Sequence, residues 1–188
     1  MRAIVGAAVI LSAPAAALAA EPEVPHCALL ITSVGTQTGN AKVDQFWADI
    51  DATVSGGASE GFTSRGLDVR PVDVKMKTKE EQLAAIVKLM NETRCTKVVQ
   101  LSRKLDGDGH TTGFTYTVSV FHLEQKLHAG GTTAAVVGDY KKEYEYPLNP
   151  DVMRTLKPTD IGTRLAADVD GSRVLEDMKA LPIAKPAA

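Results

Sequence analysis

The sequence has 188 residues, a formal net charge of −2 and a hydrophobic fraction of 44%. This length is typical of one domain that buries a core without the help of a metal. The near-neutral charge excludes a nucleic-acid binder that depends on a large basic patch, since the longest basic cluster is Lys141-Lys142.

Residues 1–20 predict a cleaved secretory signal peptide. Arg2 supplies a positive start, an apolar run covers Ala3 to Leu11, and small residues follow as far as Ala20. Signal peptidase would cut before Ala20 or before Glu21. The apolar run is shorter than the roughly 20 residues that span a bilayer, so we expect no transmembrane segment here.

The remaining residues, 21–188, are expected to form a single domain with an extended arm at 21–26 and a frayed tail at 180–188. Val24-Pro25-His26 precedes Cys27 where a bacterial lipoprotein has its lipobox, so we expect no lipid anchor. The alanine-rich leader favours a periplasmic location.

The first predicted strand is the continuous apolar run 27–34, which is typical of a strand buried on both faces. A loop at 35–40 leads into an amphipathic helix. Gly56-Gly57 leaves two alternatives, in which the helix ends there or continues to about Arg65-Gly66. The apolar face comprises Val43, Phe46, Trp47, Ile50 and Val54, and Asp44, Gln45, Asp49 and Asp51 are expected to lie away from it.

Residues 67–74 alternate between apolar and polar, which predicts a half-buried strand, and Pro71 places it at an edge of the sheet. Thr78 and Glu81 form the pattern of a capping box that opens a helix ending near Thr93. Residues 95–102 predict a third strand.

A turn at 106–110 separates this strand from the alternating strand 114–123, which we expect to be its antiparallel partner. A loop containing Gly130-Gly131 and a last strand at 139–146 follow. Three prolines mark a connection to a final helix at 161–178, interrupted or bent near Gly171.

This order predicts an α/β (α+β) fold with a mixed sheet, consisting of a β-α-β-α-β core, a β-hairpin extension and a C-terminal helix. Right-handed crossovers place the first and third strands side by side, with the second outside them. Cys27 and Cys95 begin these neighbouring strands, so the topology brings them to the same end of the sheet. Two cysteines in one exported domain usually pair, and we predict a Cys27–Cys95 disulfide.

The element order resembles the amino-terminal domain of TolB and the related domains of LpoB-type and CsgG-type envelope proteins. The elements that carry this resemblance are the strands at 28–34, 67–74 and 96–102 and the helices that begin at Val43 and Thr78. The resemblance implies an envelope protein that contacts other proteins and is not a catalyst.

No motif in the sequence predicts a cofactor or a metal site. Asp106-Gly-Asp-Gly-His110 has the alternating aspartates of a calcium loop but lacks its later glycine and glutamate, so a hairpin turn is the better interpretation. Of the histidines, only His122 and His128 are expected near each other, which is too few for zinc. The loop 35–40 could bind an anion but has no phosphate-binding motif.

Tyr140, Lys142, Tyr144 and Tyr146 share one face of the last predicted strand. If this face is exposed, it is a candidate surface for contact with a partner protein, because tyrosine is favoured in interface hot spots. If the face packs on the final helix, the tyrosines belong to the core.

Our leading functional hypothesis is a non-enzymatic envelope protein that acts through protein–protein contacts in envelope assembly or maintenance. The alternatives are a periplasmic hydrolase with an unrecognised site and a carrier of a small ligand or lipid. A large pocket with convergent polar groups would favour the hydrolase, and a deep apolar cavity would favour the carrier.

Overall fold

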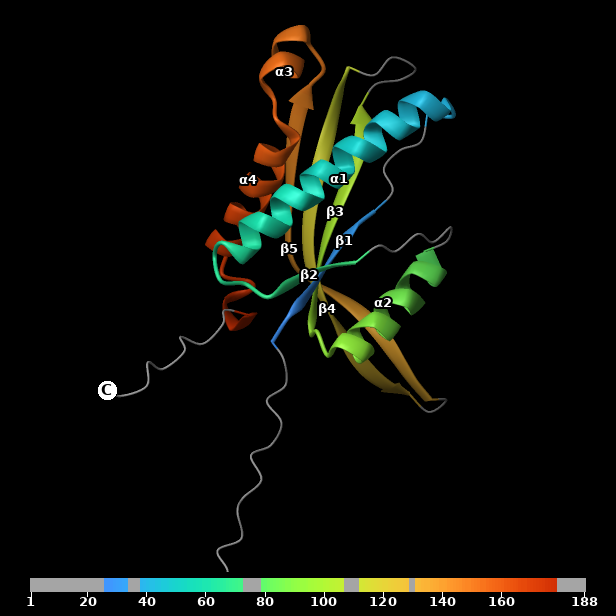
Figure 1. Ribbon diagram of the computed structural model, residues 1–188. Coiled ribbons are helices and arrows are strands. Elements are labelled where there is room, and N and C mark those ends of the chain that lie inside the picture. Colours follow the sequence, from blue (N-terminus) through green and yellow to red (C-terminus); the bar gives the residue numbers. More distant parts are fainter. Residues whose placement is uncertain (1–25, 34–37, 73–78, 107–111, 129–130, 179–188) are drawn as a thin grey trace, which may run out of the picture.

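A five-stranded mixed sheet runs through the part of the chain that the structure describes (Figure 1). The structure is a computed structural model that describes residues 26–33, 38–72, 79–106, 112–128 and 131–178. The predicted signal peptide at 1–20, most of the arm at 21–26 and the tail at 180–188 lie outside these residues. The strand order is β2-β1-β3-β4-β5, with bounds Val69–Val72, Ala28–Thr32, Lys97–Asp106, Gly113–His128 and Gly131–Pro147 respectively.

The parallel half of the sheet has the predicted topology. β1 pairs in parallel with β2 on one side and with β3 on the other. β1 lies in the interior because its apolar side chains are buried on both faces. β2, which contains Pro71, is the edge strand, as its missing backbone donor requires.

The disulfide between Cys27 and Cys95 is present and joins the starts of β1 and β3. The two Cα atoms are 4.6 Å apart, and both side chains are buried. The backbone amide of Thr96 donates to the carbonyl oxygen of Cys27, which continues the pairing of these two strands. The predicted neighbouring positions of the two strands and the predicted disulfide are both confirmed.

Helices cover both faces of the sheet. The helices α1 (Ala41–Thr63) and α4 (Pro158–Gly171), together with the short 3-10 helix η1 (Glu176–Met178), contribute to the larger core. A short helix, α3 (Pro150–Thr155), lies between β5 and α4 in the chain. α2 (Lys79–Thr93) packs on the opposite face, where Ile86 and Met90 meet Leu29 and Val98. The alternation of side chains along β1 supplies both cores, since Leu30 belongs to the larger one.

Helix α1 continues through Gly56-Gly57, which decides between the two alternatives for its end. It reaches Thr63, and Gly66 follows with a positive φ of 73°. The continuation is explained by α4, which crosses α1 so closely that a Cβ on Gly57 would overlap the carbonyl oxygen of Thr159. Glycine costs helix propensity here, but it permits the close packing of the two helices.

The predicted polarity of α1 is wrong at three positions. Val43 and Phe46 were expected on the buried face, yet they are 38% and 46% exposed. Asp51 was expected to lie away from that face, yet it is only 7% exposed. Asp51 is buried because it has a buried cationic partner, Arg103 on β3.

The β4–β5 hairpin is longer than the sequence indicates. Residues 124–138 were expected to form mostly loop, but β4 and β5 pair from Gly113↔Pro147 to His128↔Gly131, with one β-bulge where the register shifts between Val120 and Phe121. β3 pairs with β4 only as far as Lys97↔His122, so the far end of the hairpin is a two-stranded ribbon. The sequence analysis missed this extension because the apolar alternation stops after Leu123, whereas the backbone of both strands goes on pairing.

The proline-marked connection contains a short helix that the sequence analysis missed. Asn149 caps α3 by accepting a hydrogen bond from the Val152 amide, and Pro150 occupies the first turn. α4 begins with Pro158 and ends at Gly171, so the predicted interruption at this glycine is confirmed. Among the residues that the structure describes, no helix is long and apolar enough to cross a membrane.

Candidate functional site: an apolar pocket beside a buried ion pair

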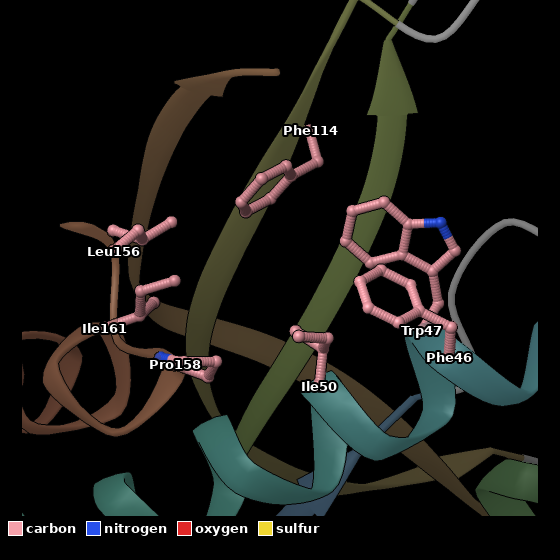
Figure 2. A pocket seen from close by; sticks show the side chains of 7 residues that line it. All are labelled: Phe46, Trp47, Ile50, Phe114, Leu156, Pro158 and Ile161. Atoms are coloured by element: carbon pink, nitrogen blue, oxygen red, sulfur yellow. The ribbon is translucent and has the colours of Figure 1, made fainter. Parts of the chain in front are cut away.

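An apolar pocket opens between the amino-terminal half of α1, β4 and the junction of α3 with α4 (Figure 2). Its volume is about 250 Å³. Every side chain that lines it is apolar, and the seven are Phe46, Trp47, Ile50, Phe114, Leu156, Pro158 and Ile161.

Three separate segments supply these walls. On α1, Phe46, Trp47 and Ile50 project together because residues three and four positions apart share a helix face. Phe114 stands near the start of β4, and Figure 2 shows the benzene ring of the Trp47 indole turned toward it. The remaining wall consists of Leu156, Pro158 and Ile161, where Pro158 begins α4.

An array of aromatic rings holds one side of the pocket in place. The centroid of the Trp47 ring is 5.3 Å from those of both Phe46 and Phe114. Phe114 in turn stacks on Tyr146 of β5 at 5.2 Å. These separations are typical of favourable aromatic pairs, so the pocket wall is preorganised while Phe46 stays half-exposed.

A buried ion pair lies directly behind this wall. The Arg103 guanidinium of β3 donates to both carboxylate oxygens of Asp51, at 2.9 and 3.2 Å. Tyr116 of β4 donates its hydroxyl to the same carboxylate at 2.6 Å. The Arg103 guanidinium carbon also lies 4.5 Å from the ring centroid of Trp47, which therefore contacts both the pocket and the cation.

Burial and a neighbouring charge both change the pKa of the tyrosine in this cluster. Burial, followed by the charge of the Asp51 carboxylate, raises the pKa of Tyr116 far above its ordinary value. Tyr116 is therefore a neutral hydrogen-bond donor at physiological pH and not a nucleophile. Arg103 Nη1 is buried without a hydrogen-bond partner among the described residues, but both Asp51 and Asp44 exert their negative charge on this arginine, which disfavours a bound anion.

The chemistry of the pocket suits a single large apolar group. Among the residues that the structure describes, no charged side chain lines it. Its volume is also below the range of roughly 300–1,000 Å³ that is usual for small-molecule sites.

The predicted tyrosine-bearing face of β5 packs on α4. Tyr144 is 6% exposed, and its hydroxyl and the Lys142 ammonium both donate to the carboxylate of Asp168, the latter at 2.8 Å. These two donors lower the pKa of Asp168, Lys142 first. Tyr140 and Tyr146 are partly buried against the same core. Of the two alternatives for this face, the structure shows packing on the final helix, and a partner contact by its exposed parts stays a prediction.

The other candidate residues do not form a metal site among the residues that the structure describes. Residues 107–111 of the suspected calcium loop lie outside them, and Asp106 instead accepts hydrogen bonds from Thr112 and Thr115. His122 contacts Asp139 and Glu124 through opposite ring nitrogens, so these groups do not converge on one ion. Of His128, the structure describes only the backbone.

The amino-terminus of α1, where an anion was considered, is already occupied by side chains of the protein. Asn40 accepts from the amides of Lys42 and Val43, and Asp44 in the first turn accepts from Thr38. Residues 34–37 of the preceding loop lie outside the described residues, as does Thr78 of the predicted capping box.

Sequence reasoning missed the pocket and the ion pair. One usable signal was Arg103, which follows Val99 and Leu101 at alternate positions and therefore belongs to the buried face of its strand. A buried arginine requires a carboxylate partner, and Asp51 occurs within the apolar pattern of α1. No local signal in the sequence indicated that Leu156 and Pro158 would line the same pocket as Phe46.

Comparison with known proteins shows no matching family model and no matching curated protein. Among solved structures, the chain is similar to a PelC dodecamer from Paraburkholderia phytofirmans that carries one substitution. The sequence identity is 10% and the TM-score 0.37, with 84% of this chain and 92% of that chain covered. A second PelC dodecamer from the same organism gives 9% identity and a TM-score of 0.35, with 84% and 91% covered.

Proposed function

We propose that the protein is a non-enzymatic component of the bacterial cell envelope that binds another protein through the apolar pocket. The observation that carries this proposal is a preformed aromatic pocket with a half-exposed phenylalanine at its rim. Interface hot spots are enriched in aromatic residues and cluster around pockets that a partner side chain fills.

The proposed location is the periplasm. The predicted signal peptide supports export, and the Cys27–Cys95 disulfide is typical of an oxidising compartment. The element order, which resembles envelope domains of the TolB, LpoB and CsgG types, also supports this location and a role in protein contacts.

The two alternatives are less well supported by the geometry of the pocket. A hydrolase would need polar groups in the pocket, and all seven lining residues are apolar. A lipid carrier would need a deeper cavity than about 250 Å³, because such cavities bury most of their ligand. Protein contact requires neither feature.

The decisive experiment places a photo-crosslinking amino acid at position 46 in the native host. The captured protein is identified by mass spectrometry, purified, and titrated against the exported form of this protein. We expect Phe46→Ser to weaken the measured affinity by about tenfold or more, because it removes an aromatic wall of the pocket.

Val136→Ser is the matched control, since Val136 is also an exposed apolar residue but does not line the pocket. This variant should bind as the wild type does. An affinity that is unchanged in Phe46→Ser, or recovery of a stoichiometric small molecule in place of a protein, would overturn the proposal.

A further inference from the structure

A cluster of three ionisable side chains lies where the main sheet becomes a two-stranded ribbon. His122 is the last residue of β4 that pairs with β3, and beyond it β4 pairs with β5 alone. Asp139 is the extra residue of a β-bulge, because Val120 pairs with Tyr140 and Phe121 pairs with Gly138. In Figure 1, both strands change direction in this region, as is usual at a bulge.

The two ring nitrogens of His122 face two different carboxylates. Nδ1 lies 3.0 Å from each oxygen of Asp139, and Nε2 lies 3.6 Å from an oxygen of Glu124. Asp139 belongs to β5 and Glu124 to the ribbon part of β4, so the imidazole connects both strands of the ribbon at its root.

The number of donors decides which protonation state suits this arrangement. A neutral imidazole has one N–H donor and one lone pair, whereas the imidazolium has two donors. Only the imidazolium can donate to Asp139 and Glu124 together. In the neutral ring, one nitrogen lone pair faces a carboxylate, and that contact becomes repulsive.

The other charged groups near His122 do not remove this preference for the imidazolium. Lys97, its register partner on β3, directs its ammonium to the carbonyl oxygen of Val174 and to Asp177 of η1, at 2.6 and 3.1 Å. α2 packs on the opposite face of the sheet, next to Phe121. The hydrogen bond to Asp139 is the main cause that raises the pKa of His122 above its ordinary value of 6.5, and Glu124 contributes to the same direction.

We propose that His122 is a pH-sensitive clamp at the root of the β4–β5 ribbon, which is held while the ring carries both protons and is loosened when one is lost. The sign follows from the direction of the pKa shift. The stabilisation of the ribbon by His122 is complete below the pKa of His122 in the unfolded state. It disappears as the pH rises through the higher pKa of His122 in the folded state. A ribbon without a third strand is the part of the sheet with the least support, so it should respond first.

Two measurements on the exported protein test this proposal, from about pH 5 to about pH 9. NMR follows the protonation of His122, and hydrogen exchange follows the backbone amides of residues 123–128 and 132–137. Exchange is corrected for the intrinsic effect of pH and compared with the amides of β3. We expect protection of the ribbon to fall by about two- to five-fold as His122 loses its proton, the size typical of an exposed ion pair.

The variant His122→Gln should make the protection of the ribbon independent of pH. Glu143→Gln is the matched control, because it removes an exposed carboxylate on β5 that pairs with Lys141, away from the clamp. It should keep the wild-type pH profile. Equal pH dependence in His122→Gln and the wild type, or a His122 pKa at or below 6.5, would refute the clamp.

Discussion

At the scale of single residues, the buried Asp51–Arg103 pair connects the pocket to the core. The Asp51 carboxylate accepts from Arg103 and Tyr116, and Arg103 lies against the Trp47 ring. A buried pair of this kind does not add much stability relative to apolar residues of the same size, but breaking it is costly. Trp47 therefore contacts both the ion pair and the pocket.

We expect Asp51→Ala to lower the free energy of unfolding by about 3–5 kcal/mol, because the Arg103 charge is then buried without compensation. Urea denaturation measures this change. Replacing both partners, with Asp51→Leu and Arg103→Met, should recover much of the loss, since no uncompensated charge remains.

Asp49→Ala is the control for this prediction. Asp49 is exposed on the same helix, where it accepts a hydrogen bond from Gln45, and its removal should change stability by less than about 0.5 kcal/mol. Equal stability of the Asp51→Ala and Asp49→Ala variants would show that the buried pair has no such role.

At the scale of elements, the crossing of α1 with α4 sets the width of the pocket. Gly57 and Gly61 on α1 and Gly162 on α4 let the two backbones approach closely. A Cβ on Gly162 would overlap the carbonyl oxygen of Val54. This close approach carries Pro158 and Ile161, at the start of α4, to the pocket opposite Ile50.

Two neighbouring glycines offer a test of this crossing. Gly57→Ala should destabilise the protein by about 1–3 kcal/mol, because its Cβ would lie only 2.9 Å from the Cα of Thr159. Gly56→Ala should stabilise it by roughly 0.5–1 kcal/mol, since open space surrounds that position and alanine favours the helix. Thermal and urea unfolding of both variants measure the difference, and the same sign for both would contradict the proposed packing.

At the scale of the whole molecule, the disulfide joins two neighbouring interior strands at the end of the sheet where β1 and β3 begin. It closes a segment with a sequence separation of 68 residues that contains β1, α1, β2 and α2. A crosslink over such a distance strongly lowers the conformational entropy of the unfolded chain. It therefore stabilises the fold as a whole and not one element alone.

Replacing Cys27 and Cys95 by serine together should lower the free energy of unfolding by about 4 kcal/mol in the chain-entropy model. Urea denaturation with and without a reductant checks this. The wild type should lose stability on reduction, and the double variant should not respond to the reductant. If the wild type is equally stable in both conditions, the disulfide does not stabilise the fold.

Local pattern was sufficient to predict the mixed sheet, the neighbouring positions of β1 and β3, and the disulfide between Cys27 and Cys95. Burial on both faces, proline at an edge and right-handed crossovers are each readable within a short segment. The same pattern located Trp47 and Ile50 on an apolar helix face, which is part of the pocket.

The tertiary structure alone decided the course of α1 through Gly56-Gly57, the burial of Asp51, the exposure of Phe46 and the length of the β4–β5 ribbon. Each of these depends on an element distant in the sequence, or on the lack of one. α4 lies beside the glycines and Arg103 lies beside the aspartate, and β3 begins only at Lys97, so it offers the ribbon no partner beyond His122. Periodicity within a segment reports which face is apolar, but the partner that covers that face is selected only when the chain packs.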